Sequence, residues 1–348
     1  MNATTKAVVG VDTAKSVFQL YSVDMETGEV ISKQLKRGQF LLWFSNRAPC
    51  LVGMEACGGS QHWARQLQAL GHEVKLMGGK MVKAFVSGNK NDAADARAIW
   101  LAAQQAGVKE VAVKTEAQQA VLAMHRMRQQ LVKMRTAQRN ELRGLLAEYG
   151  EVFGLGRAAF SVGMKGALAR LAERLPAVLI DTLREQCNEL VRLDERIGAI
   201  EARLQVWFRE DRAAQAIAAI PGVGLLMATA AVATMGQPNA FRSGREFAAW
   251  IGLVPAQTGT GGKVKLLGIS KRGDTYLRTL LIHGARAVQH HTQAPTRWLQ
   301  DIGQRRPPNV VTVALANKIA RTIWAVLAHR HAYDRDHVSQ RPQAAMPT

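Results

Sequence analysis

Acidic residues and cysteine are both scarce in this sequence. Asp and Glu together number 27 among 348 residues, against 46 Lys and Arg, which gives a formal net charge of +19. A charge of that size makes a polyanion, nucleic acid above all, the expected partner. The three cysteines, Cys50, Cys57 and Cys187, have no metal-ligand spacing. Their odd, low number argues against a disulfide framework and for a reducing compartment.

A signal peptide and an unbroken membrane span are also missing. The N-terminal stretch MNATTKAVVGVD has no basic segment followed by an apolar core. The longest apolar run, at 216–235, is interrupted by Pro221, Gly222 and Gly224 and is rich in alanine, so it does not fit a transmembrane helix. We therefore expect a cytoplasmic protein with no membrane partner. Hydrophobic residues at 47% and charged residues at 21% fit a globular chain with a sizeable core.

Hydrophobic patterning predicts a mixed α/β region in residues 1–115. Strands that first form a meander and then alternate with helices are typical of a mixed sheet with helices packed on it. The expected strands are 6–12, 16–23, 29–35, 51–55, 72–77 and 108–113, and the expected helices are 39–47, 61–70 and 92–105.

Two long helices are expected in residues 116–210, at 116–149 and 177–208. In the second, Leu190, Leu193, Ile197, Ile200 and Leu204 follow a heptad seam, which is typical of a coiled-coil hairpin. The segment Gly154–Gly166 is expected to belong to the connection. A mainly α-helical domain is expected in residues 211–335. Its expected helices are 223–235, 244–251, 273–290 and 309–331, with a mobile glycine-rich loop at Gly259–Gly268. The polar tail at 336–348 is expected to be disordered.

Acidic side chains occur where predicted strands end and where a predicted helix begins. Asp12 ends the first strand in GVDTAK, and Glu55 ends the fourth in GMEACGG. Asp92 and Asp95 open the helix at 92–105 and lie on one face of it because they are three residues apart. Carboxylates gathered at one sheet edge suit hard divalent cations. Two such ions can hold the attacking and leaving oxygens of a phosphodiester.

The alternative for these acids is structural. Asp92 is a favourable N-cap, acids in a first helical turn suit the helix dipole, and Asp12 alone is compatible with a turn. Two observations favour metal ligation. First, the acids occur together at two strand ends and one helix start in a strongly basic chain. Second, burying an isolated Glu at the end of an apolar strand costs free energy unless the carboxylate is paired or metal-bound.

The segments GVDTAK, GMEACGG and KNDAADARAI resemble, in order and approximate spacing, the acidic quartet of the DEDD insertion-sequence transposases of the IS110 type. The resemblance implies a RuvC-like member of the ribonuclease H fold for residues 1–115. It also implies that Asp12, Glu55, Asp92 and Asp95 are catalytic and bind Mg²⁺, with Mn²⁺ as the alternative ion. The expected activity is that of a bacterial DNA transposase or recombinase.

Glycine and basic residues recur in the C-terminal third. The segment Ile220–Gly224, IPGVG, is typical of a helix–hairpin–helix motif whose backbone N–H groups face a phosphate; an ordinary glycine-rich connection is the alternative. Backbone amides and cations around the loop at 259–268 suit a phosphodiester, and a solvated basic loop is the alternative there. The predicted nucleic-acid-binding residues are Lys15, Gly222, Gly224, Gly261, Gly262, Lys263, Lys265, Lys271 and Arg272.

The stretch 250–286 is similar to the C-terminal transposase domain of the same family, which also contains a helix–hairpin–helix motif. In that family a serine of the glycine loop is the covalent nucleophile on DNA. This loop has Thr258 and Thr260 but no serine, and Thr260, directly before Gly261, is the best positional match. Three alternatives stay open: threonine replaces serine, another hydroxyl such as Ser270 acts, or this copy is inactive. We favour the first.

The resemblance further implies a structured non-coding guide RNA and a homo-oligomer, a dimer or tetramer, in which acids and hydroxyl meet between two subunits. The charge fits DNA and RNA equally. In that arrangement the helical hairpin carries protein–protein contacts, and an intramolecular bundle is equally compatible with its sequence.

Three other functions are compatible with parts of the sequence. His283, Arg286 and Tyr333 match the H-x-x-R and tyrosine pattern of tyrosine recombinases, but the H-x-x-R pattern is short and common. A RuvC-like hydrolytic nuclease, such as a junction resolvase, would use the acids without forming a covalent bond to DNA. A non-enzymatic basic nucleic-acid-binding protein would need no divalent metal.

Overall fold

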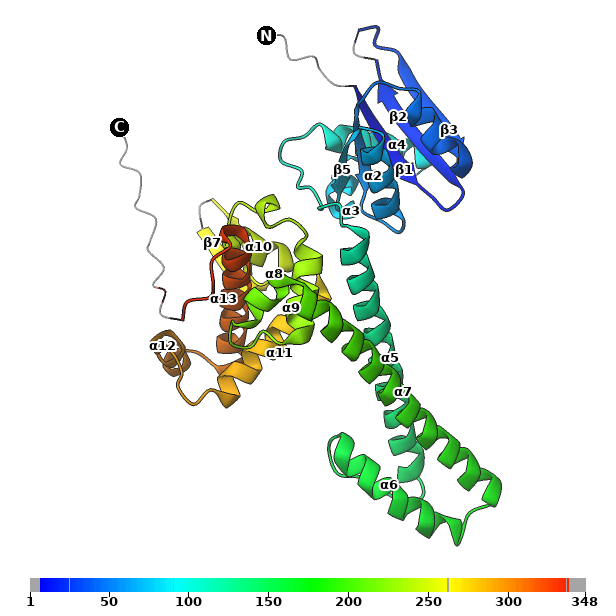
Figure 1. The fold of residues 1–348 in the computed structure, drawn as a ribbon, viewed down its shortest axis with the longest axis vertical. Helices are drawn as coiled ribbons and strands as arrows, with labels where there is room; N and C mark the ends of the chain where they lie inside the picture. Colours follow the sequence, from blue (N-terminus) through cyan, green and yellow to red (C-terminus); the bar gives the residue numbers. More distant parts are fainter. Residues whose placement is uncertain (1–6, 25, 90, 262, 336, 338–348) are drawn as a thin grey trace. The chain divides into compact units, whose positions relative to one another are not determined.

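The computed structural model describes residues 7–335 and 337, apart from 25, 90 and 262 (Figure 1). The chain divides into two compact units. The described residues of Met1–Glu116 and Met235–Ala240 form the first, which we call the N-terminal unit. Those of Ala117–Thr234 and Phe241–Thr348 form the second, which we call the helical unit.

A five-stranded mixed sheet forms the centre of the N-terminal unit. The strand order is β3-β2-β1-β4-β5, in which β1, β2 and β3 are antiparallel neighbours and β1, β4 and β5 are parallel neighbours. These five strands confirm the predicted meander followed by α/β alternation. The strands are β1 (Val8–Thr13), β2 (Val17–Val23), β3 (Val30–Lys36), β4 (Leu51–Glu55) and β5 (Glu73–Met77).

The strand predicted at 108–113 is wrong. This segment makes one isolated bridge, between Met77 and Glu110. Side chains of a neighbouring helix take its next backbone groups instead: the N–H of Lys114 donates to Gln61 Oε1 at 2.7 Å, and Arg65 Nη1 donates to the Lys114 carbonyl at 2.9 Å. Gln61 Nε2 also donates to the Ala112 carbonyl at 3.4 Å. Side chains of this helix thus take the place of strand pairing at the end of the segment.

Helices cover both faces of the sheet. On one face, Phe18 of β2 packs edge-to-face against Phe40 and Trp63, which anchor α1 (Phe40–Ser45) and α2 (Ser60–Ala69). On the other face lies α4 (Asp92–Ala103). The short α3 (Gly79–Val82) follows β5. The predicted helices at 39–47, 61–70 and 92–105 are thus confirmed.

The approach of α4 to the sheet depends on glycine. A Cβ added to Gly10 of β1 would lie 2.4 Å from the Ala96 carbonyl oxygen, and one added to Gly53 of β4 would lie 2.7 Å from Ala103 Cβ. Buried Lys75 fixes the far end of α4, because its Nζ donates to the carbonyls of Ala103 and Gln105 at 2.9 and 3.1 Å. A cation at a helix C-terminus also complements the helix dipole.

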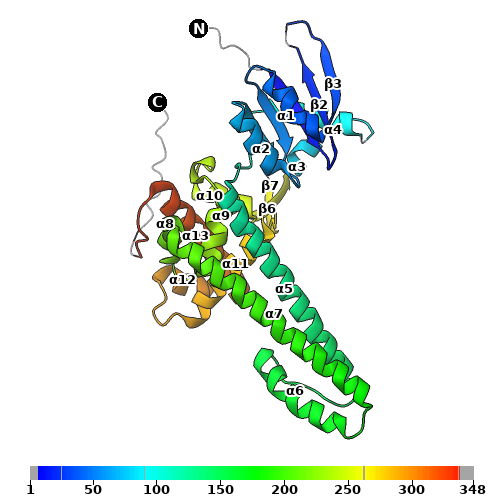
Figure 2. The same cartoon turned by 45° about the vertical axis from the view of Figure 1, so that its right-hand side comes forward.

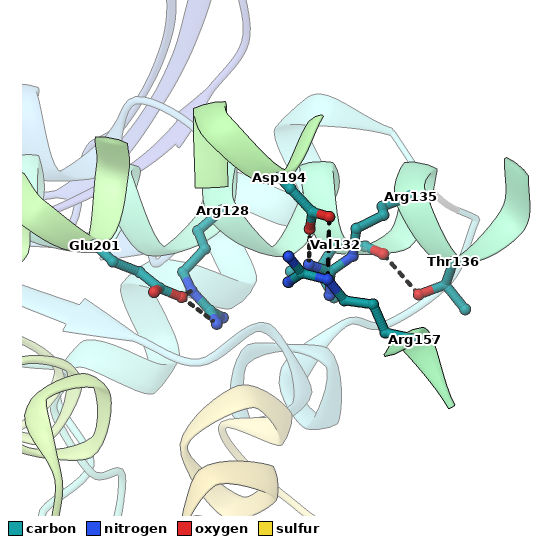
Figure 3. A network of polar contacts seen from close by, with 7 residues as sticks. All are labelled: Arg128, Val132, Arg135, Thr136, Arg157, Asp194 and Glu201. Atoms are coloured by element: carbon teal, nitrogen blue, oxygen red, sulfur yellow. Dashed lines mark hydrogen bonds and ion pairs between the residues drawn. The ribbon is translucent and has the colours of Figure 1, made fainter. Parts of the chain in front are cut away.

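In the helical unit, α5 (Glu116–Ala147) and α7 (Ala177–Glu210) run side by side as a long hairpin (Figures 1 and 2). The five predicted heptad residues of α7 are all buried, which confirms the seam. Ion pairs reinforce it: Arg128 bonds Glu201 at 2.7 Å, and Asp194 accepts from Arg135 at 2.6 Å and pairs with Arg157 at 3.3 Å (Figure 3).

The segment predicted as part of the connection contains a helix, α6 (Arg157–Ala172). Its glycines are accommodated by packing, since a Cβ on Gly163 would lie 2.9 Å from the ring of Phe153. Phe160, Met164 and Leu171 bury one face of α6 against α5 and α7. This apolar periodicity is present in the sequence, but the glycines obscure it.

The remaining helices of this unit are α8 (Arg212–Ala218), α9 (Leu225–Met235), α10 (Gly244–Ile251), α11 (Thr275–His291), α12 (Arg297–Arg305) and α13 (Pro308–His329). Of these, α8, α10, α11 and α12 pack against α13, and α9 packs against α5 and α7. The four predicted helices correspond to α9, α10, α11 and α13, whereas α8 and α12 were not predicted. Within the described chain, α13 alone has the length and apolarity that could span a membrane, and its buried residues pack in the core of the unit.

Candidate active site

The carboxyl ends of β1 and β4 bring two of the predicted acids together. Val11 is paired with Met54 in parallel register, so Asp12 and Glu55 follow that pair on adjacent strands. Side chains alternate along a strand, and Gly10 and Gly53 both face α4. Asp12 and Glu55, two residues further along, therefore face the same side.

The other two acids lie in the first turn of α4, but neither caps it. The cap is Asn91, whose Oδ1 accepts from the N–H of Ala94 at 2.8 Å. The structural alternative, in which Asp92 is the N-cap, is therefore wrong. Because Asn91 satisfies the helix end, the carboxylates of Asp92 and Asp95 stay available for other ligands.

The four acids are electrostatically linked through Asp12. Burial is the main cause that raises the pKa of the Asp12 carboxyl. The negative charges of Asp95, Asp92 and Glu55 raise that pKa further. Like-charge repulsion of this kind favours the binding of a cation. Among the described residues, no three His, Cys, Asp or Glu side chains are grouped closely enough to hold a metal ion as they stand.

Glu55 is positioned by a glycine that the sequence analysis did not identify. A Cβ added to Gly79, at the start of α3, would lie 2.4 Å from Glu55 Oε1 and 3.0 Å from its carboxyl carbon. The Glu55 carboxylate thus lies against the backbone of Gly79. The sequence signal for this position was the pair Gly78-Gly79, which directly follows the predicted strand 72–77.

The glycine-rich segment predicted as a mobile loop is an antiparallel hairpin of β6 (Pro255–Thr260) and β7 (Lys263–Ile269). Thr260 is paired with Lys263, and Thr258 with Lys265. Directly opposed residues project from the same face of a sheet, so both threonines and both lysines share one face. All four are exposed.

The alternative hydroxyl is less accessible. Ser270 Oγ is buried, although the residue as a whole is only half-buried. The hydroxyls of the hairpin are therefore the ones presented to solvent. In the tyrosine recombinase pattern, His283 and Arg286 are exposed on α11 and Tyr333 follows α13 in irregular backbone.

Buried Arg278 holds the basic loop that follows the hairpin. Its guanidinium donates to the carbonyls of Ile251 and Arg272, each at 2.7 Å, and to Thr275 Oγ1 at 3.1 Å. Close packing adds to this, since a Cβ on Gly273 (φ +69°) would lie 1.8 Å from the Trp250 carbonyl oxygen. Lys271 and Arg272 thus project from a fixed backbone and are exposed.

The other predicted nucleic-acid contacts are dispersed. Gly222 (φ +86°) packs against α11, where an added Cβ would lie 2.7 Å from the Gly284 carbonyl oxygen, so packing accounts for this glycine. Gly224 is exposed with open space in front of it. Lys15 is exposed in the β1–β2 turn. Gly261 has a positive φ of 57° in the hairpin turn, and Gly262 lies outside the described residues.

Comparison with protein families matches both halves of the chain. A family described as transposase IS116/IS110/IS902 matches residues 214–299, and a transposase family of the DEDD IS110 type matches residues 9–151. The first range includes the hairpin and the Arg278 loop. The second includes all four acids.

Individual relatives match over nearly the whole chain. A probable family 20 transposase of Pseudomonas aeruginosa is 49% identical over 93% of this chain and 98% of its own length. The transposase for insertion sequence element IS1111A of Coxiella burnetii is 42% identical over 94% of this chain and 91% of its own length. The transposase for insertion sequence element IS1328 of Yersinia enterocolitica is 36% identical over 92% of this chain and 96% of its own length.

Proposed function

Since the chain belongs to the IS116/IS110/IS902 transposase family and is therefore an enzyme of DNA strand transfer, we propose that it cuts and rejoins DNA with a metal-binding acidic quartet and a threonine nucleophile. The observation that carries the proposal is the convergence of three acidic charges on Asp12 at one edge of the sheet. The strand order, antiparallel meander first and parallel strands after it, supports a RuvC-like fold for this unit.

Asp12, Glu55, Asp92 and Asp95 would hold Mg²⁺, or Mn²⁺ in its place. Four carboxylates provide the oxygen ligands that such cations prefer, and the repulsion that raises the pKa of Asp12 is relieved by a bound cation. A divalent ion, when bound, stabilises the charge on the attacking and leaving oxygens of a phosphodiester. Asp12 and Glu55 fix the site to the sheet, and α4 supplies the other two ligands.

Thr260 would be the nucleophile. In the exchange, its Oγ1 forms a bond to phosphorus, one bond from phosphorus to a deoxyribose oxygen breaks, and a proton passes from the threonine to the departing oxygen. Lys263 lies directly opposite on the same hairpin face, where a cation favours the approach of a phosphate. Lys265, Lys271 and Arg272 extend this basic surface along the strand and the following loop.

Two further parts of the proposal concern partners. A structured guide RNA selects the DNA, and the enzyme acts as a homo-oligomer in which the hydroxyl of one subunit serves the acids of another. The net charge of +19 suits both nucleic acids. The α5–α7 hairpin is the element we assign to subunit contacts.

The test combines purified protein, the RNA encoded beside its element, junction DNA and Mg²⁺. We expect a protein–DNA adduct that survives denaturation in the wild type and disappears in both Asp92→Ala and Thr260→Ala. Metal-dependent cleavage without an adduct would instead identify a hydrolytic nuclease. An adduct that persists in Thr260→Ala would move the nucleophile to Ser270 or Tyr333. DNA binding that needs no metal and leads to no cleavage would support a non-enzymatic protein.

A further inference from the structure

A pocket of about 310 Å³ opens at the same edge of the sheet as the acids. Its lining includes Thr13, the last residue of β1, Lys15 in the turn after it, Arg37 after β3, Cys57 and Gly59 after β4, and Trp63 of α2. Thr13 directly follows Asp12, and successive residues of a strand point to opposite faces. The pocket therefore lies on the α2 side of the sheet, whereas Asp12 faces α4.

Two cations of this pocket have no carboxylate partner. Neither Lys15 nor Arg37 forms an ion pair within the described chain. Arg37 is held in place all the same: its guanidinium carbon lies 4.7 Å from the centre of the Trp63 ring, and its Nη1 donates to the Lys15 carbonyl at 3.3 Å. Pre-positioned guanidinium groups suit phosphate, since less freedom is lost when they bind.

Backbone donors complete the pocket. Among the described residues, no acceptor is bonded to the N–H groups of Gly58 and Gly59, which lead into the N-terminus of α2. Unpaired N–H groups at the start of a helix favour an anion. Cations and N–H groups thus surround one space whose lining contains no acidic residue.

We propose that this pocket binds a phosphate of the DNA strand being cut, next to the phosphate that the acids attack. The proposal rests on the proposed function for its reaction, and on the pocket for its site. A strand crossing the carboxyl ends of β1 and β4 passes from the α4 face, where Asp12 lies, to the α2 face, where Lys15 and Arg37 lie. Arg37 is then a positioning residue that sets which phosphate reaches the acids.

Cys57 provides a direct readout of occupancy. It lines the pocket and is exposed, whereas Cys187 lies in α7 and serves as an internal reference, and Cys50 is buried. In the experiment, iodoacetamide modifies the full-length protein in EDTA with increasing oligothymidylate, and peptide mass spectrometry gives the alkylation rate of each cysteine. We expect DNA to slow alkylation of Cys57 and to leave that of Cys187 unchanged.

The matched variants are Arg37→Ala and Arg47→Ala. Arg47 also stacks on a tryptophan of the same unit, 3.8 Å from the centre of the Trp43 ring, but does not line the pocket. Arg37→Ala should raise the DNA concentration for half-protection by about tenfold, the scale of one hydrogen bond to a charged group. Arg47→Ala should leave it unchanged, and Arg37→Lys should recover part of the loss. Lys15→Ala, which keeps the Arg37–Trp63 stack, should weaken protection as well.

Equal effects of Arg37→Ala and Arg47→Ala would overturn the proposal. So would unprotected Cys57 at DNA concentrations that fluorescence anisotropy shows to be saturating, or equal protection of Cys187. Protection by oligouridylate of the same length, without protection by oligothymidylate, would reject a DNA site in favour of RNA. The EDTA removes divalent metal, so the outcome does not depend on whether the acids and Thr260 carry out the proposed chemistry.

Discussion

Thr260 is paired with Lys263 across the turn of the β6–β7 hairpin. Thr260 is the last residue of β6, and Lys263 is the first residue of β7. The hydroxyl and the ammonium group share one exposed face. A phosphate that approaches this face would meet the hydroxyl and the cation together. Thr258 shares the face but lies opposite Lys265, so the two threonines can be tested separately.

Replacing Thr260 by alanine should abolish the covalent adduct and lower strand transfer by about a thousandfold or more, because it removes the hydroxyl that we propose as the nucleophile. Thr258→Ala removes the same atoms two residues away and should keep most of the activity. Thr260→Ser should retain the adduct, since a serine hydroxyl is less crowded than that of threonine. Gel analysis of denatured protein–DNA products measures all three, and an adduct in Thr260→Ala would contradict the assignment.

Gly79→Ala should weaken the binding of Mg²⁺ by about tenfold or more, an effect comparable to loss of a residue that orients a metal ligand. The reason is steric: the new methyl group would occupy the position of the Glu55 carboxylate, which must rotate away. Stability should change little, because the displaced group is the end of a flexible side chain. Titration of the melting temperature with Mg²⁺ measures the affinity.

The neighbouring Gly78→Ala is the matched control for this prediction. Gly78 has an ordinary extended backbone and no atom within 4 Å of an added Cβ. It should bind Mg²⁺ as the wild type does. Equal affinities of the two variants would show that Glu55 is not a ligand whose position matters.

Arg278→Met should lower the free energy of unfolding by about 3 kcal/mol, because two carbonyls and a hydroxyl lose a buried charged donor. The exposed Arg286 on the same helix offers a control, and Arg286→Met should be nearly neutral. Urea denaturation followed by circular dichroism distinguishes them. A loss below about 1 kcal/mol for Arg278→Met would mean that water replaces the guanidinium.

His125 should make the protein less stable in acid. Burial lowers the pKa of this imidazole from 6.5 to about 4, so the unfolded chain takes up its proton at a higher pH than the folded chain does. The contribution of neutral His125 to the free energy of unfolding is therefore fully present above pH 6.5. It decreases as the pH falls from 6.5 towards 4, and His125 causes no further loss below pH 4. The loss amounts to about 3 kcal/mol.

The comparison of wild type with His125→Gln isolates this contribution, since all other titrating groups are shared. The variant should be less stable at pH 7 and should lose less stability between pH 7 and pH 5. Urea denaturation at several pH values gives both quantities. Parallel pH profiles would indicate that His125 is hydrated in the folded protein.

Much of this fold was predictable because its signals are local. The β strands of the sheet, the α7 seam and the position of Asp12 and Glu55 at strand ends all follow from alternation or heptad spacing within short segments. That α4 packs across β1 and β4 was not predictable, because it depends on Gly10 and Gly53, which are far apart in sequence and become informative only once the strands are paired.

Each error of the sequence analysis has a physical cause that the structure identifies. Glycine is a signal for loops in a sequence, so α6 and the β6–β7 hairpin were not predicted where glycine serves close packing or a tight turn. The segment at 108–113 has strand-forming residues, but Gln61 and Arg65 compete for its backbone. The cap at Asn91 was not predicted because asparagine and aspartate are equally good caps and stand next to each other here.

The buried contacts of His125 fix the position of α5 relative to α9 and α11. Its ring nitrogens lie 2.8 Å from Tyr276 Oη and 3.0 Å from Thr229 Oγ1, and that threonine donates to the Leu225 carbonyl. The apolar seam alone would tolerate a slip of one heptad, about 10 Å along the axis, but such a slip would leave His125 unpaired. These three side chains thus act as a length standard: they set how far the tip of the α5–α7 hairpin reaches from the helices packed around α13.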